Sequence, residues 1–433
     1  MKHVLLVLLI VPLFSQSDLP HGLTDDEKLN LHLIGVNRTI TDPPDSIVFA
    51  PAEFDSVAGV IFAWEQYYTL LKQMIKETAE SDTAWVVVNG SSEETTVTNE
   101  LNSYGVNMDR VEFIYDNLNS VWIRDYGPWW IYQPDGTRAV IDLDYNRPRP
   151  QDDAFPEDLA NLWNLDYYGL GLVEAGGNML LDGKGAVLLS NVIFDASQGF
   201  DPNLTVDQLE TYFDEYFGVH KVIITDHLNN DGTGHIDMFV KVINDTTVIV
   251  GEYAPGTGAT GNAEICDQVA DQIANETNGE GRPFNVIRML MPDNVGGVSY
   301  TYINSLIVNK KIYVPVYGFQ TDAAVLAQYE SIVPEYEIIG YDCNQIITAN
   351  GAIHCITMKV PAMIEWVDPC EDWILGDVNN DGNIDVHDLL SVADIVLGFE
   401  EPGICSERVA DINEDQNVTA MDLITLLNLI MGW

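Results

Sequence analysis

Basic residues are scarce in this chain of 433 residues. There are 19 Lys and Arg against 67 Asp and Glu, a formal net charge of -48. A field of that sign repels nucleic acid and anionic membrane surfaces, so we expect neither as a partner. The same field attracts cationic substrates, although solubility in salty surroundings would also explain acidic residues spread along the whole sequence. Both interpretations stay open.

Cysteine is also scarce, and the count of five is odd. In an oxidising compartment an odd count leaves at least one free thiol or an intermolecular bond. Cys370 and Cys405 flank the first half of a C-terminal module and could pair. Cys266 and Cys343 could also pair, although nothing local demands it. Cys355 is then the spare thiol.

Long hydrophobic runs are lacking except at the N-terminus. Lys2 and His3 precede an apolar run over residues 4–14, and Ser15-Gln16-Ser17 has the small-x-small pattern of a cleavage site. This arrangement is typical of a secretory signal peptide, residues 1–17, and it is too short to cross a bilayer comfortably. The sequence therefore predicts a secreted, soluble protein.

Residues 18 to about 368 alternate between strand-like and helix-like patterns. Turn signals such as "PDG" and "LDGKG" stand where hairpins are expected. We therefore expect an α/β domain whose sheets are not purely parallel. The clearest strand-like runs are "SVAGVIFAW", "TAWVVVNG", "RVEFIYD", "HIDMFVKVINDTTVIVGEY" and "SLIVNKKIYVPVYG", and the clearest helix-like runs are "EQYYTLLKQMIKETAES", "TVDQLETYFDEYFG" and "AEICDQVADQIANET".

Composition changes sharply after "DPCEDW", where two similar acidic loops follow each other. Their oxygen-bearing side chains recur at the spacing of a calcium loop, with the last carboxylate in the first turn of a helix. Gly382 permits the sharp turn of the first loop, whereas Gln416 replaces it in the second, so we expect a weaker second site. The candidate ligands are Asp377, Asn379, Asp381, Asn383 and Asp388, then Asp411, Asn413, Asp415, Asn417 and Asp422.

Each loop precedes an apolar helix, "LLSVADIVLG" or "LITLLNLIMG", so the unit is duplicated. One such loop alone is often a solvated turn, but two matched copies favour Ca²⁺ binding. The duplicated loop and helix, over residues 374–433, resembles a type I dockerin. The resemblance implies a cohesin-type partner on a scaffold or surface protein.

Four stretches of the large domain concentrate polar residues in apolar, Gly-rich surroundings: "VWIRDYGPWW", "DYNRPRPQDD", "GTGHIDMFVKV" and "ANGAIHCITMKVP". Each has a structural explanation when taken alone. Arg124 and Asp125 could be an ion pair at a strand end. His235 and Asp237, two apart on a strand, would share one face and could form a polar rim on a half-exposed strand. The arginines of "NRPRP" could compensate surface charge.

Taken together, the motifs resemble the bacterial peptidylarginine deiminase and agmatine deiminase family. They occur in the family's order over most of residues 45–365: "WIRDYGPWW", "GGNMLLDG", "GHIDMF", "YTYINSLIVN" with "VPVYG", and "IHCIT". The resemblance implies the pentein fold, a five-bladed α/β propeller around a central site, and hydrolysis of guanidines without a cofactor.

The resemblance assigns four catalytic residues, and their chemistry suits a guanidine. Asp125 and Asp237 would hold the planar cation, because carboxylates accept its paired hydrogen bonds. Cys355 would attack the poorly electrophilic guanidinium carbon as a thiolate, which the bound cation favours. His235 would protonate the departing ammonia and then activate the water that hydrolyses a thiouronium intermediate.

Three further residues lie in or beside these motifs. Trp122 would stack on the cation. Asn304 would be a supporting polar group near the site. His354, next to the nucleophile, should point away by strand alternation, so we interpret it as structural.

The stretch "NRPRPQDD" resembles the peptidylarginine-type enzymes, in which arginines contact the carboxylate of a C-terminal arginine. Arg147 and Arg149 fit that role, and agmatine has no carboxylate for them. Ala175, rather than a glutamate, precedes Gly176, with Glu174 displaced by one residue. The run before Cys355 also departs from the Gly-rich pattern of the agmatine branch.

The sequence thus favours a secreted peptidylarginine deiminase that forms citrulline and ammonia. The alternatives are an agmatine deiminase that forms N-carbamoylputrescine, a cysteine protease or amidase using Cys355 and His235, and a non-catalytic, calcium-loaded adhesion subunit.

Overall fold

A computed structural model describes residues 19–36, 38–364, 370, 372–399, 402–415 and 417–432. The predicted signal peptide and Gln416 lie outside these ranges. The chain falls into two compact units, one with almost all residues up to Met363 and one from Ile364 onwards. Among the described residues, we find no helix both long and apolar enough to cross a membrane.

The described residues of the first unit form five small sheets. Four of them have three strands in chain order, the first antiparallel to the second and the second parallel to the third. Their strands are β4 (Trp129–Tyr132), β5 (Arg138–Tyr145) and β6 (Asp166–Glu174); β7 (Met179–Leu181), β8 (Ala186–Ser190) and β9 (Lys221–Thr225); β10 (Val240–Asn244), β11 (Thr247–Glu252) and β12 (Asn285–Leu290); and β13 (Leu306–Val308), β14 (Lys311–Val316) and β15 (Glu337–Asp342).

The fifth sheet closes the unit. Its order is β16-β1-β2-β3, and β16 pairs antiparallel with β1, so the last strand joins the first. The other two pairs are parallel. The sheet thus repeats the pattern of the other four with one extra strand. Its strands are β1 (Val57–Ala63), β2 (Thr83–Val88), β3 (Val111–Tyr115) and β16 (Met358–Pro361).

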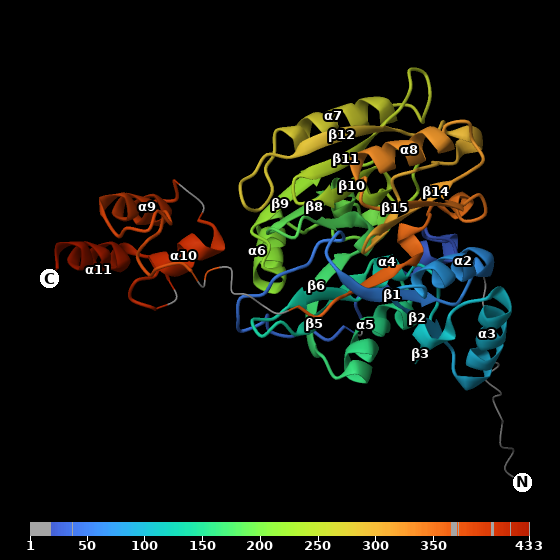
Figure 1. The fold of residues 1–433 in the computed structure, drawn as a ribbon, viewed down its shortest axis with the longest axis horizontal. Helices are drawn as coiled ribbons and strands as arrows, with labels where there is room; N and C mark the ends of the chain where they lie inside the picture. The colour runs from blue at the N-terminus through green and yellow to red at the C-terminus, as the bar shows by residue number, and fades with distance from the viewer. Residues whose placement is uncertain are drawn as a thin grey trace, which may run out of the picture. The chain divides into compact units, whose positions relative to one another are not determined.

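A helix links the second and third strands of every sheet, as a parallel pair requires. In Figure 1 these helices lie toward the outside of the unit and the strands lie between them. Five repeats of one strand-helix pattern confirm the predicted five-bladed α/β propeller. The linking helices are α2 (Tyr68–Thr78), α5 (Pro150–Trp163), α6 (Val206–Phe217), α7 (Asn262–Ala274) and α8 (Asp322–Ile332), with α3 (Ser91–Tyr104) between β2 and β3.

Helix α6 illustrates how local sequence sets these elements. Thr205 and Gln208 form a capping box at its start, and Gly218 ends it with φ of 64°. Leu209 and Phe213, one turn apart, face the core and are fully buried. The helix predicted from "TVDQLETYFDEYFG" is therefore confirmed to within a residue at each end.

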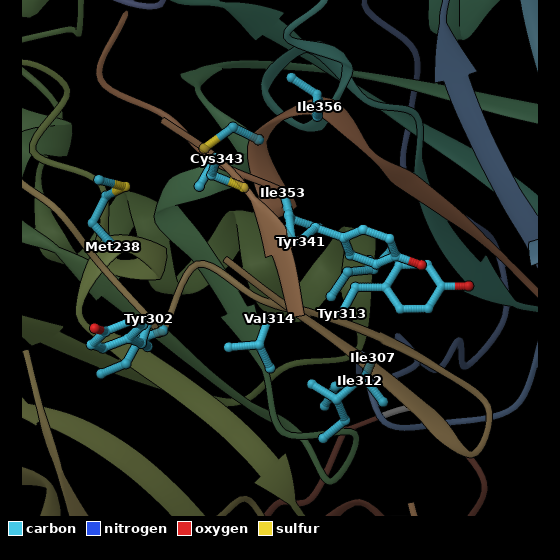
Figure 2. Packing of buried hydrophobic residues seen from close by; sticks show 14 of the residues in the cluster. Met238, Tyr302, Ile307, Ile312, Tyr313, Val314, Tyr341, Cys343, Ile353 and Ile356 are labelled. Carbon is cyan, nitrogen blue, oxygen red and sulfur yellow. The ribbon is translucent and has the colours of Figure 1, made fainter. Parts of the chain in front are cut away.

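Apolar packing anchors the turns that carry the polar motifs. Figure 2 shows Met238, Tyr302 and Ile353, from three separate turns, in one buried cluster. Cys343 belongs to the same cluster. The suggested pairing of Cys266 with Cys343 is wrong, because both are free, buried thiols that pack as small apolar side chains.

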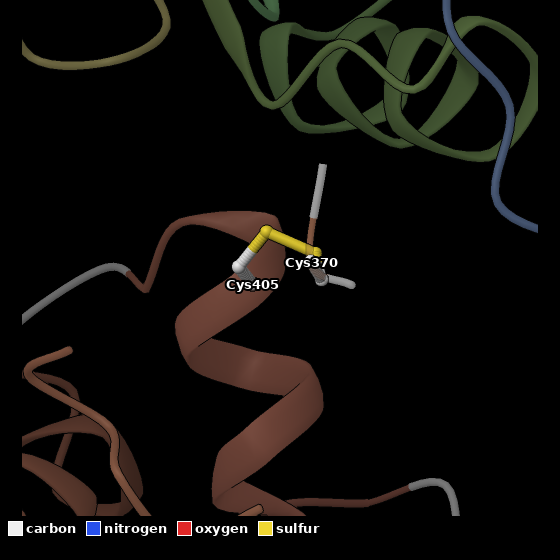
Figure 3. Close-up of a disulfide and its surroundings, with 2 residues drawn as sticks. All are labelled: Cys370 and Cys405. Carbon is white, nitrogen blue, oxygen red and sulfur yellow. A yellow bond between two sulfur atoms is a disulfide. The ribbon is translucent and has the colours of Figure 1, made fainter. Parts of the chain in front are cut away.

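The described residues of the second unit form three helices, α9 (Val386–Val396), α10 (Ile404–Ala410) and α11 (Ala420–Met431). Val392 and Leu426, from α9 and α11, are fully buried in its small core. Cys370 and Cys405, which the sequence suggested could pair, form a disulfide (Figure 3). A small domain needs such a link because its core alone is thin.

Candidate active site

Five short turns, one before the first strand of each sheet, hold the polar motifs other than "NRPRP", which leads from β5 into α5. They are α4 (Ile123–Tyr126) before β4, Gly176–Asn178 before β7, Ile236–Met238 before β10, residues 300–305 before β13 and His354–Ile356 before β16. The pseudo-fivefold arrangement of the sheets thus brings together residues more than two hundred positions apart.

Hydrogen bonds tie these turns to one another. The Gly177 N–H donates to Asp125 Oδ1 at 3.3 Å, and the Ile236 N–H donates to Asn178 Oδ1 at 3.3 Å. The His354 N–H donates to Asn304 Oδ1 at 3.1 Å. The turns therefore position their side chains as one connected network.

Asp125, His235 and Asp237 converge on one point. A Cβ placed on Gly177 would lie 2.5 Å from His235 Nδ1, 3.0 Å from Asp125 Oδ1 and 3.2 Å from Asp237 Oδ2. All three side chains are buried. Both ring nitrogens of His235 and the Oδ1 atom of Asp237 lack a hydrogen-bond partner, which is costly for buried polar groups. Such atoms are suited to receive a polar ligand.

The predicted backbone of this motif is wrong. His235 and Asp237 are not on a strand, because Ile236–Met238 is a turn of 3-10 helix and β10 begins only at Val240. Asn178 holds this turn by accepting the Ile236 N–H, so the two side chains meet through the turn and not through strand alternation.

Charge and burial set the protonation of this cluster. Burial lowers the pKa of His235 to about 4, against the opposing pull of Asp125. Burial raises the pKa of Asp125, but the charge and hydrogen bond of His21, with the charge of Arg147, outweigh it and hold that pKa well below its ordinary value. At neutral pH the site therefore has a neutral His235 beside an ionised Asp125.

The Cys355 thiol is fully buried at the same place. Asn304 Nδ2 donates to its sulfur at 3.2 Å, and Asp237 Oδ2 lies 3.9 Å from the sulfur. Burial, with the negative charges of Asp237 and Asp125, raises the pKa of Cys355 well above its ordinary value. A cation that neutralised these carboxylates would favour the thiolate.

His354 does not point away from the site, contrary to the sequence interpretation. It lies in a 3-10 turn, where strand alternation does not apply. Its ring joins Asp237 Oδ2, 2.7 Å from Nδ1, to Glu53 Oε2, 2.6 Å from Nε2. Lys241 in turn lies 2.5 Å from Glu53 Oε1. His354 thus positions Asp237, and Glu53, which no sequence motif indicated, fixes His354.

An N-terminal segment, residues 19–30, occupies the centre of the site. The His21 ring stacks on Trp122 with centroids 4.3 Å apart and planes 13° apart. His21 Nε2 lies 2.5 Å from Asp125 Oδ2, and His21 Nδ1 lies 2.7 Å from the Asn350 carbonyl oxygen. Sequence reasoning missed this residue, because a lone histidine far from every motif carries no signal.

Arg147 and Arg149 are buried against this segment, so they do not serve to compensate surface charge. Arg147 Nε donates to the His21 carbonyl oxygen at 3.3 Å. Arg149 donates from Nε to Glu27 Oε1 at 2.7 Å and from Nη2 to the Pro20 carbonyl oxygen at 2.8 Å. Arg147 Nη2 has no partner. The structure thus brings every predicted catalytic and substrate-binding residue together.

In the second unit, each acidic loop is followed by a helix whose first turn carries the last carboxylate of the loop, as predicted. Asp388 and Asp422 each stand third in their helices, α9 and α11, and each accepts backbone N–H groups from its loop. Asp377 Oδ1 accepts the Asp381 N–H at 3.0 Å, and Asp411 Oδ1 accepts the Asp415 N–H at 3.0 Å. Gly382, which was predicted to permit a sharp turn, has a left-handed conformation with φ of 85°.

The chain resembles known proteins in both units. Residues 49–361 match the family model of the Porphyromonas-type peptidyl-arginine deiminase, and residues 375–431 match the dockerin type I domain. A candidate agmatine deiminase of Vibrio parahaemolyticus is 26% identical over 364 residues, which cover 74% of this chain and 99% of that protein.

Solved structures support the fold. A candidate arginine deiminase of Porphyromonas gingivalis superposes with a TM-score of 0.65 at 21% identity, over 72% of this chain and 98% of that chain. An agmatine deiminase of Enterococcus faecalis superposes with a TM-score of 0.65 at 21% identity, over 76% of this chain and 100% of that chain. Both likenesses concern the fold.

The dockerin match confirms the predicted second module. The first match confirms the predicted class of enzyme, a hydrolase that acts on guanidine C–N bonds. Because that match covers more than half of the sequence, the chain belongs to the Porphyromonas-type peptidyl-arginine deiminase family.

Proposed function

We propose that this chain is a secreted peptidylarginine deiminase that converts a C-terminal arginine of a peptide to citrulline and ammonia. The observation that carries the proposal is the convergence of Asp125, Asp237 and His235 beside Cys355, with two buried arginines close by. This set of groups offers one end of the site to a cation and the other to a carboxylate.

Substrate binding follows from the geometry. The guanidinium donates paired hydrogen bonds to Asp125 and Asp237, and Trp122 covers its face. Arg149 already holds a carboxylate, since its Nε and Nη2 atoms donate to Glu27 at 2.7 Å and 3.3 Å. A substrate α-carboxylate takes the place of Glu27 there, and the free Nη2 of Arg147 supplies a further donor.

The first half-reaction forms a covalent intermediate. The arriving cation offsets the carboxylate charges that hold the Cys355 thiol protonated, and neutral His235 accepts the thiol proton. The sulfur then bonds to the guanidinium carbon, which gives a neutral tetrahedral adduct. His235 returns the proton to one amino group, the C–N bond breaks, ammonia leaves and a thiouronium remains.

The second half-reaction consumes water. His235 accepts a proton from the water as its oxygen bonds to the thiouronium carbon. The C–S bond then breaks, its electron pair returns to sulfur, and the hydroxyl proton follows to regenerate the thiol. The products are a ureido group and the protonated His235, whose proton leaves with ammonia as ammonium.

Agmatine deiminase activity is the second candidate function, because curated relatives such as the Vibrio parahaemolyticus protein carry that name. Agmatine has the guanidinium but lacks the carboxylate. The burial of Arg147 and Arg149 beside the site favours the peptide, since agmatine would leave these two cations without a substrate partner.

A ureido assay on three substrates tests the choice. A peptide ending in arginine, a peptide with internal arginine and agmatine are compared on the parent chain and on His21→Ala, because His21 occupies the site. We expect the C-terminal arginine to be turned over fastest, and Arg149→Ala to lose that activity selectively. Arg282→Ala, a control at the surface, should match the parent. Agmatine turnover equal to or above that of the peptide would refute the proposal.

The second unit supplies attachment in this proposal. The oxygen-rich donor sets of the two loops, with carboxylates held at the first turn of α9 and α11, fit the hard cation Ca²⁺. The ligands are the ten residues predicted from Asp377 to Asn383 with Asp388, and from Asp411 to Asn417 with Asp422. A cohesin-type module would then hold the enzyme outside the cell or on its surface. Pull-down with cohesin modules, with and without a chelator, tests this role.

A further inference from the structure

The N-terminal segment, residues 19–30, binds the site through its backbone as well as through His21. The His21 N–H donates to the Ala349 carbonyl oxygen at 3.3 Å. Trp122 Nε1 donates to the Leu19 carbonyl oxygen at 3.0 Å. Together with the bonds from Arg147 and Arg149, three consecutive residues of the segment have their carbonyl oxygens bound by side chains of the site.

His21 presents a cation to the site. Both of its ring nitrogens face acceptors, the Asp125 carboxylate and the Asn350 carbonyl oxygen, so both nitrogens carry protons in this arrangement. The ring is fully buried and lies flat on the Trp122 indole. A planar cation bound by a carboxylate and covered by an indole is also what a guanidinium would form here.

Glu27 presents the anion. Thr24 starts the short helix α1 (Asp25–Leu29) with a capping box, in which the Thr24 N–H donates to Glu27 Oε2 at 2.7 Å. This box fixes Glu27 so that both of its oxygens accept bonds from Arg149. The segment thus supplies a cation to Asp125 and a carboxylate to Arg149, the same two charges as a peptide that ends in arginine.

The segment also lies against the nucleophile. A Cβ placed on Gly351 would lie 3.1 Å from His21 Nδ1 and 3.2 Å from Cys355 Cβ. The His21 and His235 rings meet edge to face, with centroids 5.3 Å apart. A substrate guanidinium and the His21 ring cannot occupy this space together.

We propose that residues 19–30 are an intramolecular pseudosubstrate that blocks the catalytic site until the segment leaves it. The segment adopts the substrate's charge pattern but offers an imidazole, which has no guanidinium carbon for Cys355 to attack. Only the identity of the mimicked substrate rests on the proposed function; the occlusion of Cys355 does not.

A metal site is the competing explanation, because His21, Asp125 and His235 have ligand atoms close together. The separation of 2.5 Å between His21 Nε2 and Asp125 Oδ2 argues against it. Two atoms bound to one ion at about 2.0 Å each in tetrahedral geometry stand farther apart than that. A direct hydrogen bond accounts for the distance.

The rate of Cys355 alkylation by 2-chloroacetamidine, a small amidinium reagent, tests the proposal without any turnover. Mass spectrometry of the peptide containing Cys355 separates this thiol from the buried Cys266 and Cys343. If the closed form dominates, only the open fraction reacts, so His21→Ala should raise the rate about tenfold or more. Glu27→Gln should raise it by a smaller factor. His32→Ala, an exposed histidine of the next turn, is the matched control and should react at the parent rate.

A synthetic peptide of residues 19–30, added to His21→Ala, should slow alkylation again, and the same peptide with alanine in place of its histidine should not. Equal or slower alkylation in a folded His21→Ala chain, or no effect of the added peptide, would overturn the proposal. If a chelator raised the rate of Cys355 alkylation in the parent chain, the metal site would be favoured instead. Faster alkylation without turnover of any guanidine would retain the pseudosubstrate and reject the proposed function.

Discussion

At the scale of single residues, the site depends on a chain of buried charges behind the reacting groups. Asp237 is oriented by His354, which is fixed by Glu53, which is paired with Lys241. Burial raises the pKa of Glu53, but the charges of His354, Lys241 and Lys359 hold it well below its ordinary value. Asp237 thereby has one oxygen committed to His354 and leaves Oδ1 free for substrate.

Replacing His354 should therefore impair catalysis although His354 does not contact the substrate. In His354→Gln, Asp237 loses its fixed partner, and we expect kcat to fall by about 10- to 100-fold. The pH dependence of Cys355 alkylation should shift as well, because Asp237, 3.9 Å from the Cys355 sulfur, loses the partner that fixes it. His32→Gln is the control. Unchanged kcat and an unchanged alkylation profile would show that His354 only packs.

Glu174 predicts a pH dependence of stability. Burial raises its pKa from the ordinary 4.5 to about 8, against the hydrogen bond from the Ala175 N–H. The folded carboxyl keeps its proton where the unfolded one has lost it, so this contribution is complete below about pH 4.5 and declines as the pH rises toward 8. The slope is about 1.4 kcal/mol per pH unit for one proton.

Urea unfolding of the parent and of Glu174→Gln across this pH window measures the effect. Other buried carboxyls add their own slopes, so the difference between the two proteins is the quantity to compare. The variant should gain relative stability as the pH rises. If the free energies of unfolding of the two proteins changed in parallel with pH, the pKa shift assigned to Glu174 would be contradicted.

At the scale of elements, the turns before the first strands decide the geometry. Cys355, Asp125 and Asp237 were predicted because their motifs, in this order, resemble those of the deiminase family. Their backbone was not, because "GHIDMF" runs directly into the apolar strand β10 and periodicity cannot mark where the strand begins. His21 and Glu53 were missed for a different reason: they belong to no motif, and only the tertiary fold brings them to the site.

Gly177 tests the role of these turns. A Cβ at this position would lie only 2.5 Å from His235 Nδ1, so one side chain must shift. Gly177→Ala should therefore lower kcat by about 100-fold while the melting temperature changes little. Gly403→Ala, where a Cβ meets nothing nearby and the backbone φ is -68°, is the control for a substitution that causes no clash. Full activity in Gly177→Ala would show that the three side chains do not converge in solution.

The duplicated loops predict two separate Ca²⁺ sites in the second unit. We expect two Ca²⁺-binding steps by calorimetry, with the first loop the tighter one, because Gly382 provides its left-handed turn. Asp377→Asn should remove the tighter step and Asp411→Asn the weaker one. The loss of both steps in either variant would mean that the loops form a single cooperative site.

At the scale of the whole molecule, five similar sheets and the closing pair β16–β1 explain why one chain can collect its site from five distant motifs. The motif order predicted this propeller, whereas the strands between the motifs were too short for periodicity alone to count the sheets. The excess of acidic residues favours solubility in salty surroundings and would also attract cationic substrates.

In the proposed reaction, Cys355 and water convert a peptidyl guanidinium to a ureido group. The most direct measurement is mass spectrometry of a peptide ending in arginine after incubation in heavy-oxygen water, with the parent, His21→Ala and Cys355→Ala chains. We predict one heavy oxygen in the side chain of the terminal residue, an intact peptide backbone, and no product with Cys355→Ala. Heavy oxygen in a newly formed carboxyl terminus would reveal a protease, and product formation without Cys355 would contradict the mechanism.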